Sequence, residues 1–332
     1  MMRTTLLLVA LAGVATGQGM PDLVVHTPTL AENAREELKA IAADDCTLQA
    51  SDHCVDGPGV RKLLRFSVLA LNRGDADLFV GVPSLDDPKF VYSQCHKHFH
   101  FETFARYELR DRGSSTVVRT GQKRSFCVED LKTDPDNPFA KPCTTDADCQ
   151  GHGQCAGTGI CQYNCNYQGI QPGRGDIYES NLDCQWIDTT DVPAGEYDLW
   201  VMLNTAQQLP ESDYTNDAAM VPVTVGPASG SPVPTVKVRA KKKVRLGKDL
   251  KIGWKVKLAS GRKDIALYDV WLSRDGGVTF PELIATGVLG PAKSLKWTAT
   301  GAATDQAAVK VVAWTKALQR ADGTSRSVRI VP

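Results

Sequence analysis

The chain of 332 residues carries 38 Lys and Arg against 38 Asp and Glu, with six histidines and ten cysteines. This length allows two domains, each with a core of its own. The zero net charge is the sum of two oppositely charged halves. Residues 1–235 carry 18 basic and 31 acidic side chains (−13), whereas residues 236–332 carry 20 basic and 7 acidic ones (+13). All cysteines lie between positions 46 and 184, and their even number favours disulfides over thiolate metal sites.

Residues 1–17 have the pattern of a secretory signal peptide. Arg3 precedes a short apolar run at 6–14, and the small residues at 15–17 offer a cleavage site. The run is too short to span a membrane, and no other stretch approaches that length. We therefore expect a secreted, extracellular protein without a membrane span. It also lacks the interleaved exposed aromatic residues of a nucleic-acid-binding chain, so no nucleic-acid partner is expected.

The region from 20 to 225 is predicted to be an all-β, loop-rich sandwich held by disulfides. Only residues 29–41 show helical spacing, with Thr29 and Glu32 as a candidate capping box. Strand-like segments recur at 62–71, 90–101 and 197–203. An insert at 143–161 holds four regularly spaced cysteines, which predicts two disulfides among them in any of three pairings, with zinc binding as the alternative: Cys143, Cys149, Cys155 and Cys161.

A Pro-, Gly- and Ser-rich linker at 226–235 is followed by a basic region at 236–332. Alternating segments and the Asp275-Gly-Gly turn predict about seven short strands in a smaller immunoglobulin- or fibronectin-like β-sandwich. Its basic surface could bind anionic envelope or matrix polymers, dock on the acidic half, or form an ordinary solvated face. Its four tryptophans are expected in the core: Trp254, Trp271, Trp297 and Trp314.

The most specific chemical signal is the run from Gln94 to Glu102. On a strand, the alternate residues His96, His98 and His100 point the same way. Three neutral imidazoles on one face suit zinc, copper, iron or nickel. A half-exposed strand that happens to be rich in histidine is the alternative.

Five segments in order resemble the catalytic domain of the lysyl oxidase family, the copper amine oxidases that convert peptidyl lysine to aldehyde: 63–67, 95–100, 125–130, 183–188 and 210–216. The resemblance covers roughly residues 20–225. It implies that His96, His98 and His100 bind copper, and that Lys123 and Tyr178 form the cofactor lysine tyrosylquinone. It further implies the bridges Cys46–Cys95, Cys54–Cys184 and Cys127–Cys165, whereas Arg174 stands where another family bridge has a cysteine.

The resemblance leaves the catalytic base open. Arg106 stands where the vertebrate enzymes carry a histidine, and an arginine cannot act as a base at ordinary pH. Asp176 and Glu179, which flank Tyr178, are candidates. Some family members bind calcium at positions that match a second, oxygen-rich set, for which a solvated loop with Asx-turns is the alternative: Asp22, Leu23, Glu211, Asp213, Asn216 and Asp217.

The function implied is that of a secreted copper amine oxidase. It would oxidise lysine side chains or other primary amines with O2 and release aldehyde, hydrogen peroxide and ammonia. The acidic half would attract a cationic amine. A non-catalytic copper-binding protein on the same scaffold is the alternative. A zinc hydrolase built on the three histidines would lack a partner base and would explain neither Lys123 nor Tyr178.

Overall fold

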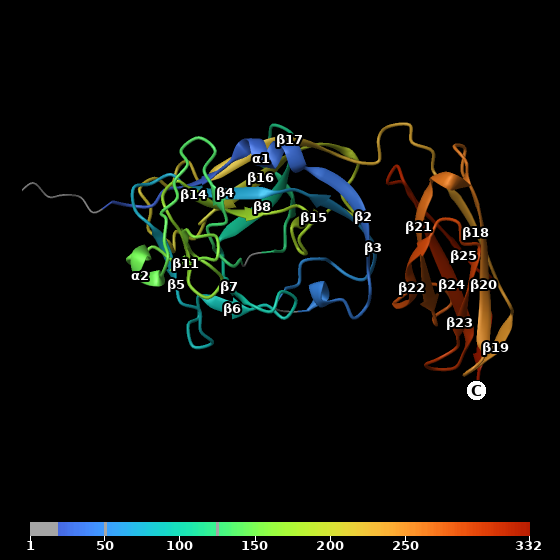
Figure 1. The fold of residues 1–332 in the computed structure, drawn as a ribbon. Helices are drawn as coiled ribbons and strands as arrows, with labels where there is room; N and C mark the ends of the chain where they lie inside the picture. Colours follow the sequence, from blue (N-terminus) through green and yellow to red (C-terminus); the bar gives the residue numbers. More distant parts are fainter. Residues whose placement is uncertain (1–18, 50–51, 124–125) are drawn as a thin grey trace, which may run out of the picture.

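A computed structural model describes residues 19–49, 52–123 and 126–332, in which β-strands far outnumber the two short α-helices (Figure 1). The all-β class predicted from the sequence is confirmed. The predicted signal peptide at 1–17 lies outside the described residues. Within the described ranges, no helix is both long and apolar enough to cross a membrane.

Three larger sheets and three strand pairs form the first part of the chain. One sheet has the order β1 (Leu23–Val25), β4 (Val68–Asn72), β14 (Arg174–Tyr178) and β10 (Lys132–Thr133). A second has the order β17 (Ala218–Val225), β16 (Gly195–Leu203), β8 (Ala105–Asp111) and β9 (Val117–Thr120). The third has the order β15 (Trp186–Asp188), β3 (Gly59–Arg65) and β2 (Arg35–Ile41). The pairs are β5 (Leu78–Gly81) with β13 (Gln168–Ile170), β6 (Phe90–Tyr92) with β7 (Phe99–Phe101), and β11 (Gln154–Cys155) with β12 (Cys161–Gln162).

A single buried cluster joins the first two sheets. Strand β17 shows why, because its residues alternate between exposed and buried, and Val221 and Val225 point inward. Aromatic side chains fill the centre, where the rings of Phe66 and Tyr107 meet edge to face at 4.8 Å between centroids. Tyr178 at the end of β14 belongs to this cluster, so the core itself fixes a predicted site residue.

The prediction of a helix over residues 29–41 is wrong for the second half of this segment. Helix α1 spans only Thr27–Asn33, and His26 rather than Thr29 precedes it as the N-cap. Residues Arg35–Ile41 form β2 instead, paired antiparallel with β3. Cross-strand partners explain the difference, because Glu37 of β2 pairs with Arg65 of β3 and Ile41 is fully buried. Tertiary pairing thus overrides the local helical spacing.

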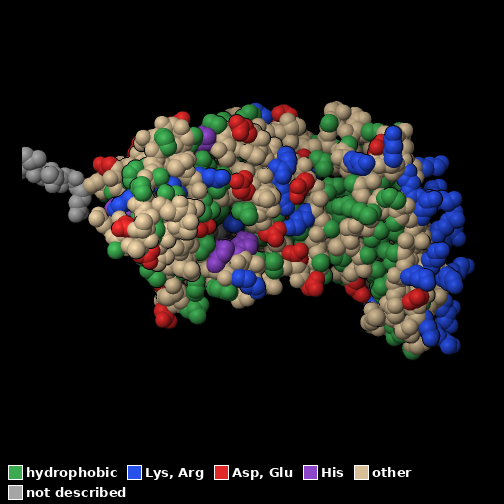
Figure 2. All heavy atoms as spheres, in the orientation of Figure 1, with side chains coloured by type: hydrophobic (Ala, Val, Ile, Leu, Met, Phe, Trp, Pro, Cys, Tyr) green, Lys and Arg blue, Asp and Glu red, His purple; other side chains and the backbone are tan. Residues whose placement is uncertain are grey.

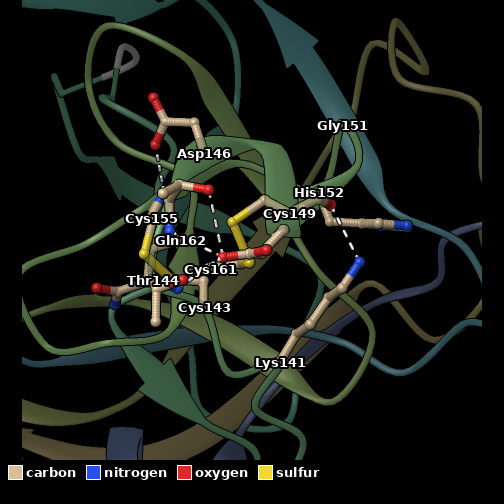
Figure 3. The surroundings of a disulfide bond; sticks show 12 residues. Lys141, Cys143, Thr144, Asp146, Cys149, Gly151, His152, Cys155, Cys161 and Gln162 are labelled. Carbon is tan, nitrogen blue, oxygen red and sulfur yellow. Dashed lines mark hydrogen bonds between the residues drawn. A yellow bond between two sulfur atoms is a disulfide. The ribbon is translucent and has the colours of Figure 1, made fainter.

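The cysteine-rich insert folds around two disulfides of its own, Cys143–Cys155 and Cys149–Cys161 (Figure 3). This pairing selects one of the three that the sequence allowed. The N-terminus of helix α2 (Asp146–Cys149) is capped by a capping box between Thr145 and Asp148. The insert is anchored to the sandwich because His152 Nδ1 lies 2.8 Å from the Asp77 carboxylate.

The basic region forms two further sheets with a separate buried core. One has the order β18 (Thr235–Ala240), β20 (Asp249–Lys257) and β23 (Ser294–Thr298). The other has the order β19 (Lys243–Arg245), β26 (Val328–Val331), β24 (Thr304–Thr315), β21 (Ile265–Ser273) and β22 (Glu282–Leu289), and β25 (Arg320–Thr324) also pairs with β24. Short 3-10 turns occur at Cys46–Leu48 and Arg262–Asp264. The assignment to an immunoglobulin or fibronectin class stays a prediction.

The two regions meet where β21 and β22 lie against β2 and β3 (Figure 1). The backbone N–H of Val60 donates to Asp269 Oδ2 at 2.8 Å, and the Thr286 hydroxyl donates to the other oxygen of Asp269 at 2.7 Å. Trp271 lies against Gly59 at this junction and is only half-buried. Of the four tryptophans predicted in the core, Trp254 lies in it and Trp297 packs against it partly buried, whereas Trp314 is buried outside this cluster. Trp271 instead packs between the regions.

Candidate metal and cofactor site

The three histidines of the run converge, but not as alternate residues of one strand. His96 and His98 lie in the turn between β6 and β7, and only His100 lies on a strand. Lys97 has a φ of 63°, and this left-handed residue folds the chain back between the two imidazoles. His100 Nε2 lies 3.2 Å from His96 Nδ1 and 3.0 Å from His98 Nε2. Nitrogen atoms at these separations can bind one ion together.

The surroundings keep the three imidazoles neutral. Burial, followed by the positive charge of Lys123, lowers the pKa of His96 to about 4. The same two causes lower the pKa of His98 and, more strongly, of His100. Because a metal binds only the unprotonated nitrogen, the histidines are ready to bind an ion at neutral pH.

Lys123 is a buried amine beside the histidines. Its side chain is 7% exposed, and burial lowers its pKa to about 8 although Asp52, Asp176 and Asp183 act in the opposite direction. Its Nζ lies 5.9 Å from the centroid of the Tyr178 ring. A depressed pKa makes more of the neutral, nucleophilic amine available.

The Tyr178 hydroxyl contacts oxygen atoms of two other residues. The hydroxyl donates to the Cys127 carbonyl oxygen at 2.9 Å and also contacts the carboxylate of Asp176. Burial raises the pKa of Asp176 well above its ordinary value, and burial together with the charge of Asp176 raises that of Tyr178. Since one hydroxyl proton serves one acceptor at a time, a protonated Asp176 would donate to Tyr178 while Tyr178 donates to Cys127.

All of these groups line one cavity of about 650 Å³. The three histidines lie on its wall with Lys123 and Tyr178. Leu131 and Leu182 add apolar surface, Lys132 adds a second basic group, and four carboxylates also line the cavity: Glu129, Asp176, Glu179 and Asp183. Three converging imidazoles, a buried amine, a buried phenol and several carboxylates therefore share one space.

The family model described as lysyl oxidase matches residues 22–228, well over half of the chain. The chain belongs to the lysyl oxidase family. Among curated relatives, lysyl oxidase homolog 2 of Xenopus tropicalis is 34% identical over 213 residues, which cover 62% of this chain and 25% of that protein. The homologs of Gallus gallus and Homo sapiens are 33% and 32% identical, with 62% of this chain and 24% of theirs covered. The chain thus spans about a quarter of the length of these relatives.

Solved structures add nothing to this assignment. The 47-kilodalton lipoprotein Tp47 of Treponema pallidum aligns with 92% of this chain and 51% of its own, at 15% identity and a TM-score of 0.22. So low a TM-score carries no argument about the fold.

The disulfides implied by the lysyl oxidase resemblance are present in the structure. Cys46 is bonded to Cys95, directly before His96, and the others are Cys54–Cys184 and Cys127–Cys165. Arg174, at the position of the missing family cysteine, is buried and pairs with the buried Asp130 at 3.3 Å. A buried ion pair therefore joins β14 to the segment that follows Cys127.

The structure separates the residues considered for the catalytic base. Asp176 is 1% exposed and contacts Tyr178, whereas Glu179 is exposed at the same cavity. Arg106 is paired with Glu108 and lines a different cavity of about 340 Å³. Of the two carboxylates, Asp176 is therefore the one in direct contact with Tyr178.

Two further residues at the site, Glu129 and Ser93, are not predicted from the sequence. Glu129 is half-buried in the cavity wall, and burial together with the charge of Asp130 raises its pKa to about 7. Ser93 accepts the His96 backbone N–H at 3.0 Å and donates to Asp52 at 2.6 Å, which fixes the histidine turn. Both lie in or beside the quoted family segments, but only the fold reveals their contacts.

The oxygen-rich set is partly assembled. Asn216 Nδ2 donates to both carboxylate oxygens of Asp22, at 3.1 and 3.2 Å, and the Leu23 N–H donates to the buried Glu211 at 2.8 Å. Asp213 instead accepts two hydrogen bonds from Thr215.

Two oxygens of this set, Asn216 Oδ1 and Asp217 Oδ1, are buried and have no hydrogen-bond partner among the residues that the structure describes. Among the described residues, only His- and Cys-containing groups bring three ligand atoms within 4.8 Å of one another, so the acidic set is looser than the histidine set.

Proposed function

We propose that this protein is a secreted, copper- and quinone-dependent amine oxidase. It would convert lysine side chains or other primary amines, with O2 and water, into aldehyde, ammonia and hydrogen peroxide. The observation that carries the proposal is the shared cavity, in which three converging neutral histidines adjoin a buried lysine and a buried tyrosine. Membership of the lysyl oxidase family supports the same reaction class.

The residues fit both groups that the reaction needs. His96, His98 and His100 would hold copper through neutral nitrogen atoms. Lys123 and Tyr178 would be joined into lysine tyrosylquinone. When present, copper and O2 supply the oxidation of the tyrosine ring, and the resulting quinone supplies the sink for the electrons of the amine.

The protein's own residues would position the reactants. Cys127, through its carbonyl oxygen, and Asp176 orient the phenol ring, and Lys123 presents an amine of lowered pKa to that ring. When it is ionised, Asp176 would then take the proton from the carbon beside the substrate nitrogen, and its raised pKa would make it a stronger base than an ordinary carboxylate.

The cavity also suits the substrate class. A lysine side chain has an apolar stem and a cationic end. Leu131 and Leu182 offer contacts to the stem, and the excess of acidic over basic side chains in residues 1–235 would attract the ammonium group. This arrangement accommodates a peptidyl lysine or a free primary amine.

The proposal assigns further roles along the chain. Residues 20–225 would be the catalytic domain with its insert at 143–161, and residues 236–332 a basic accessory sandwich after the linker at 226–235. Calcium would bind the acidic set, since its unpaired oxygens on Asn216 and Asp217 are hard ligands.

Peroxide release from a lysine-containing peptide tests the proposal. The copper-loaded protein should release peroxide, and Tyr178→Phe should abolish the release while copper content stays unchanged. Phenylhydrazine should form a coloured adduct only with the tyrosine-containing protein. Copper binding without adduct or peroxide would instead favour a non-catalytic copper-binding protein, a candidate kept open by Arg106 and Arg174.

A further inference from the structure

One face of the sheet β18–β20–β23 carries a regular array of Lys and Arg side chains. Along β20, Leu250, Ile252 and Trp254 are buried, whereas Lys251 and Lys255 lie on the opposite face of the strand and are exposed. The neighbouring strands repeat the pattern, with exposed basic residues at alternate positions: Lys237 and Arg239 on β18, and Lys296 on β23.

The strand register brings like charges together. Lys237 lies opposite Lys255, and Lys251 lies opposite Lys296. Like charges directly across a sheet are destabilising, so folding alone gives no reason for this arrangement. None of these lysines forms an ion pair with another described residue. The acid on this face, Asp249, lies at the end of its strand and accepts the Thr298 hydroxyl at 3.0 Å.

The face is also hollowed. A groove of about 730 Å³ runs over its centre, where Gly253 lies between Arg239 of β18 and Ser294 of β23. Gly253 and Ser294 form the floor of the groove, and basic side chains form its walls. The aromatic residue at the groove, Trp254, is itself buried in the core below.

The groove points away from the catalytic region. The sandwich meets that region through β21 and β22, which belong to its other sheet. Figure 2 shows Lys and Arg gathered on the side of the sandwich that faces away from the rest of the molecule. The site is therefore open to a large ligand while the catalytic cavity stays free.

We propose that this groove binds a linear anionic polysaccharide. Outward residues of one strand repeat about every 6.7 Å and neighbouring strands lie about 4.8 Å apart, so the array presents charge at regular intervals to a chain that carries an anion on each repeat. A groove accepts a chain better than the flat surface of a membrane. Without exposed aromatic side chains, it offers no stacking platform for nucleic-acid bases.

Binding of the full-length protein to a fluorescent heparin oligosaccharide, followed across a salt series, tests this site. We expect saturable binding that weakens as salt rises. Lys251→Glu with Lys255→Glu should weaken binding about tenfold or more. The matched control is Lys316→Glu with Arg326→Glu, which makes the same change of charge at exposed loop positions outside the groove and should weaken it less than threefold.

A second pair of variants guards against misfolding. Gly253→Glu and Gly253→Gln place side chains of nearly equal size on the groove floor, so only the glutamate should oppose an anion. Equal losses from the groove and control variants, or from both Gly253 variants, would overturn the proposal. So would tighter binding of duplex DNA or of phosphatidylserine vesicles than of heparin at the same salt concentration. Neither outcome depends on amine oxidase activity, so this test stands apart from that of the proposed function.

Discussion

Asp176 is the residue on which the proposed chemistry depends most after Tyr178 itself. Asp176→Asn keeps the shape of the side chain but removes its ability to take a proton. We expect peroxide release to fall about 100-fold or more, as for loss of a general base, with copper content unchanged. The measurement is the initial rate of peroxide release across a pH series.

Glu179→Gln provides the matched control, because Glu179 is exposed at the same cavity. Its rate should stay within about threefold of the unmodified protein, as is usual for a surface charge. A large loss with Glu179→Gln and none with Asp176→Asn would reverse the assignment of the base.

The turn between β6 and β7 brings the histidines together, and Ser93 is its main polar support. Ser93→Ala should weaken copper binding about 10-fold, since residues that orient metal ligands have effects of this size. Ser93→Thr, which keeps the hydroxyl, should restore most of the affinity. Competition titration with a chelator measures both variants, and unchanged affinity in Ser93→Ala would show that the turn needs no such support.

The acidic loop before β17 predicts a pH-dependent response to calcium. Burial and the neighbouring Glu211 and Asp22 raise the pKa of Asp217 to about 7. The charged form is therefore disfavoured in the folded protein, and the cost to stability grows as the pH rises from the ordinary carboxyl pKa through about 7. Calcium should offset this cost and raise Tm by a few degrees at pH 8 but hardly at pH 5.

Asp217→Asn tests the cause of that response. It removes the charge, so it should lose most of the calcium-dependent shift in Tm while magnesium has little effect on either protein. An equal calcium shift in Asp217→Asn and the unmodified protein would exclude this site.

Element by element, the sequence predicted what depends on local pattern and missed what depends on distant partners. Strand β16 and the strands of the basic region follow from alternation. Residues 35–41 look helical, yet they pair with β3 because Glu37 and Ile41 find partners far along the chain. The three histidines converge as expected, but through the left-handed turn at Lys97, which no alternation rule contains. The roles of Ser93 and Glu129 depend on contacts that only the folded chain brings about.

At the scale of the whole molecule, the basic sandwich is docked rather than loosely tethered. Asp269 is 3% exposed and accepts hydrogen bonds from Val60 across the junction and from Thr286 within the sandwich. Asp269→Ala would leave the Val60 N–H without its acceptor and should cost about 2 kcal/mol of unfolding free energy. Chemical denaturation measures this loss, and limited proteolysis should cut the linker at 226–235 faster.

Asp305→Ala is the control, because Asp305 is exposed on β24. Its unfolding free energy should change by less than about 0.5 kcal/mol. Equal stability of Asp269→Ala and the unmodified protein would mean that the junction contributes little to the fold.

The proposed chemistry requires Lys123 and Tyr178 to become one covalently joined cofactor. Peptide mass spectrometry after copper loading in air tests it most directly. We expect the peptide containing Lys123 to become covalently linked to the peptide containing Tyr178, and Lys123→Arg to prevent the link without loss of bound copper. Separate, unmodified peptides from protein that has bound copper would contradict it.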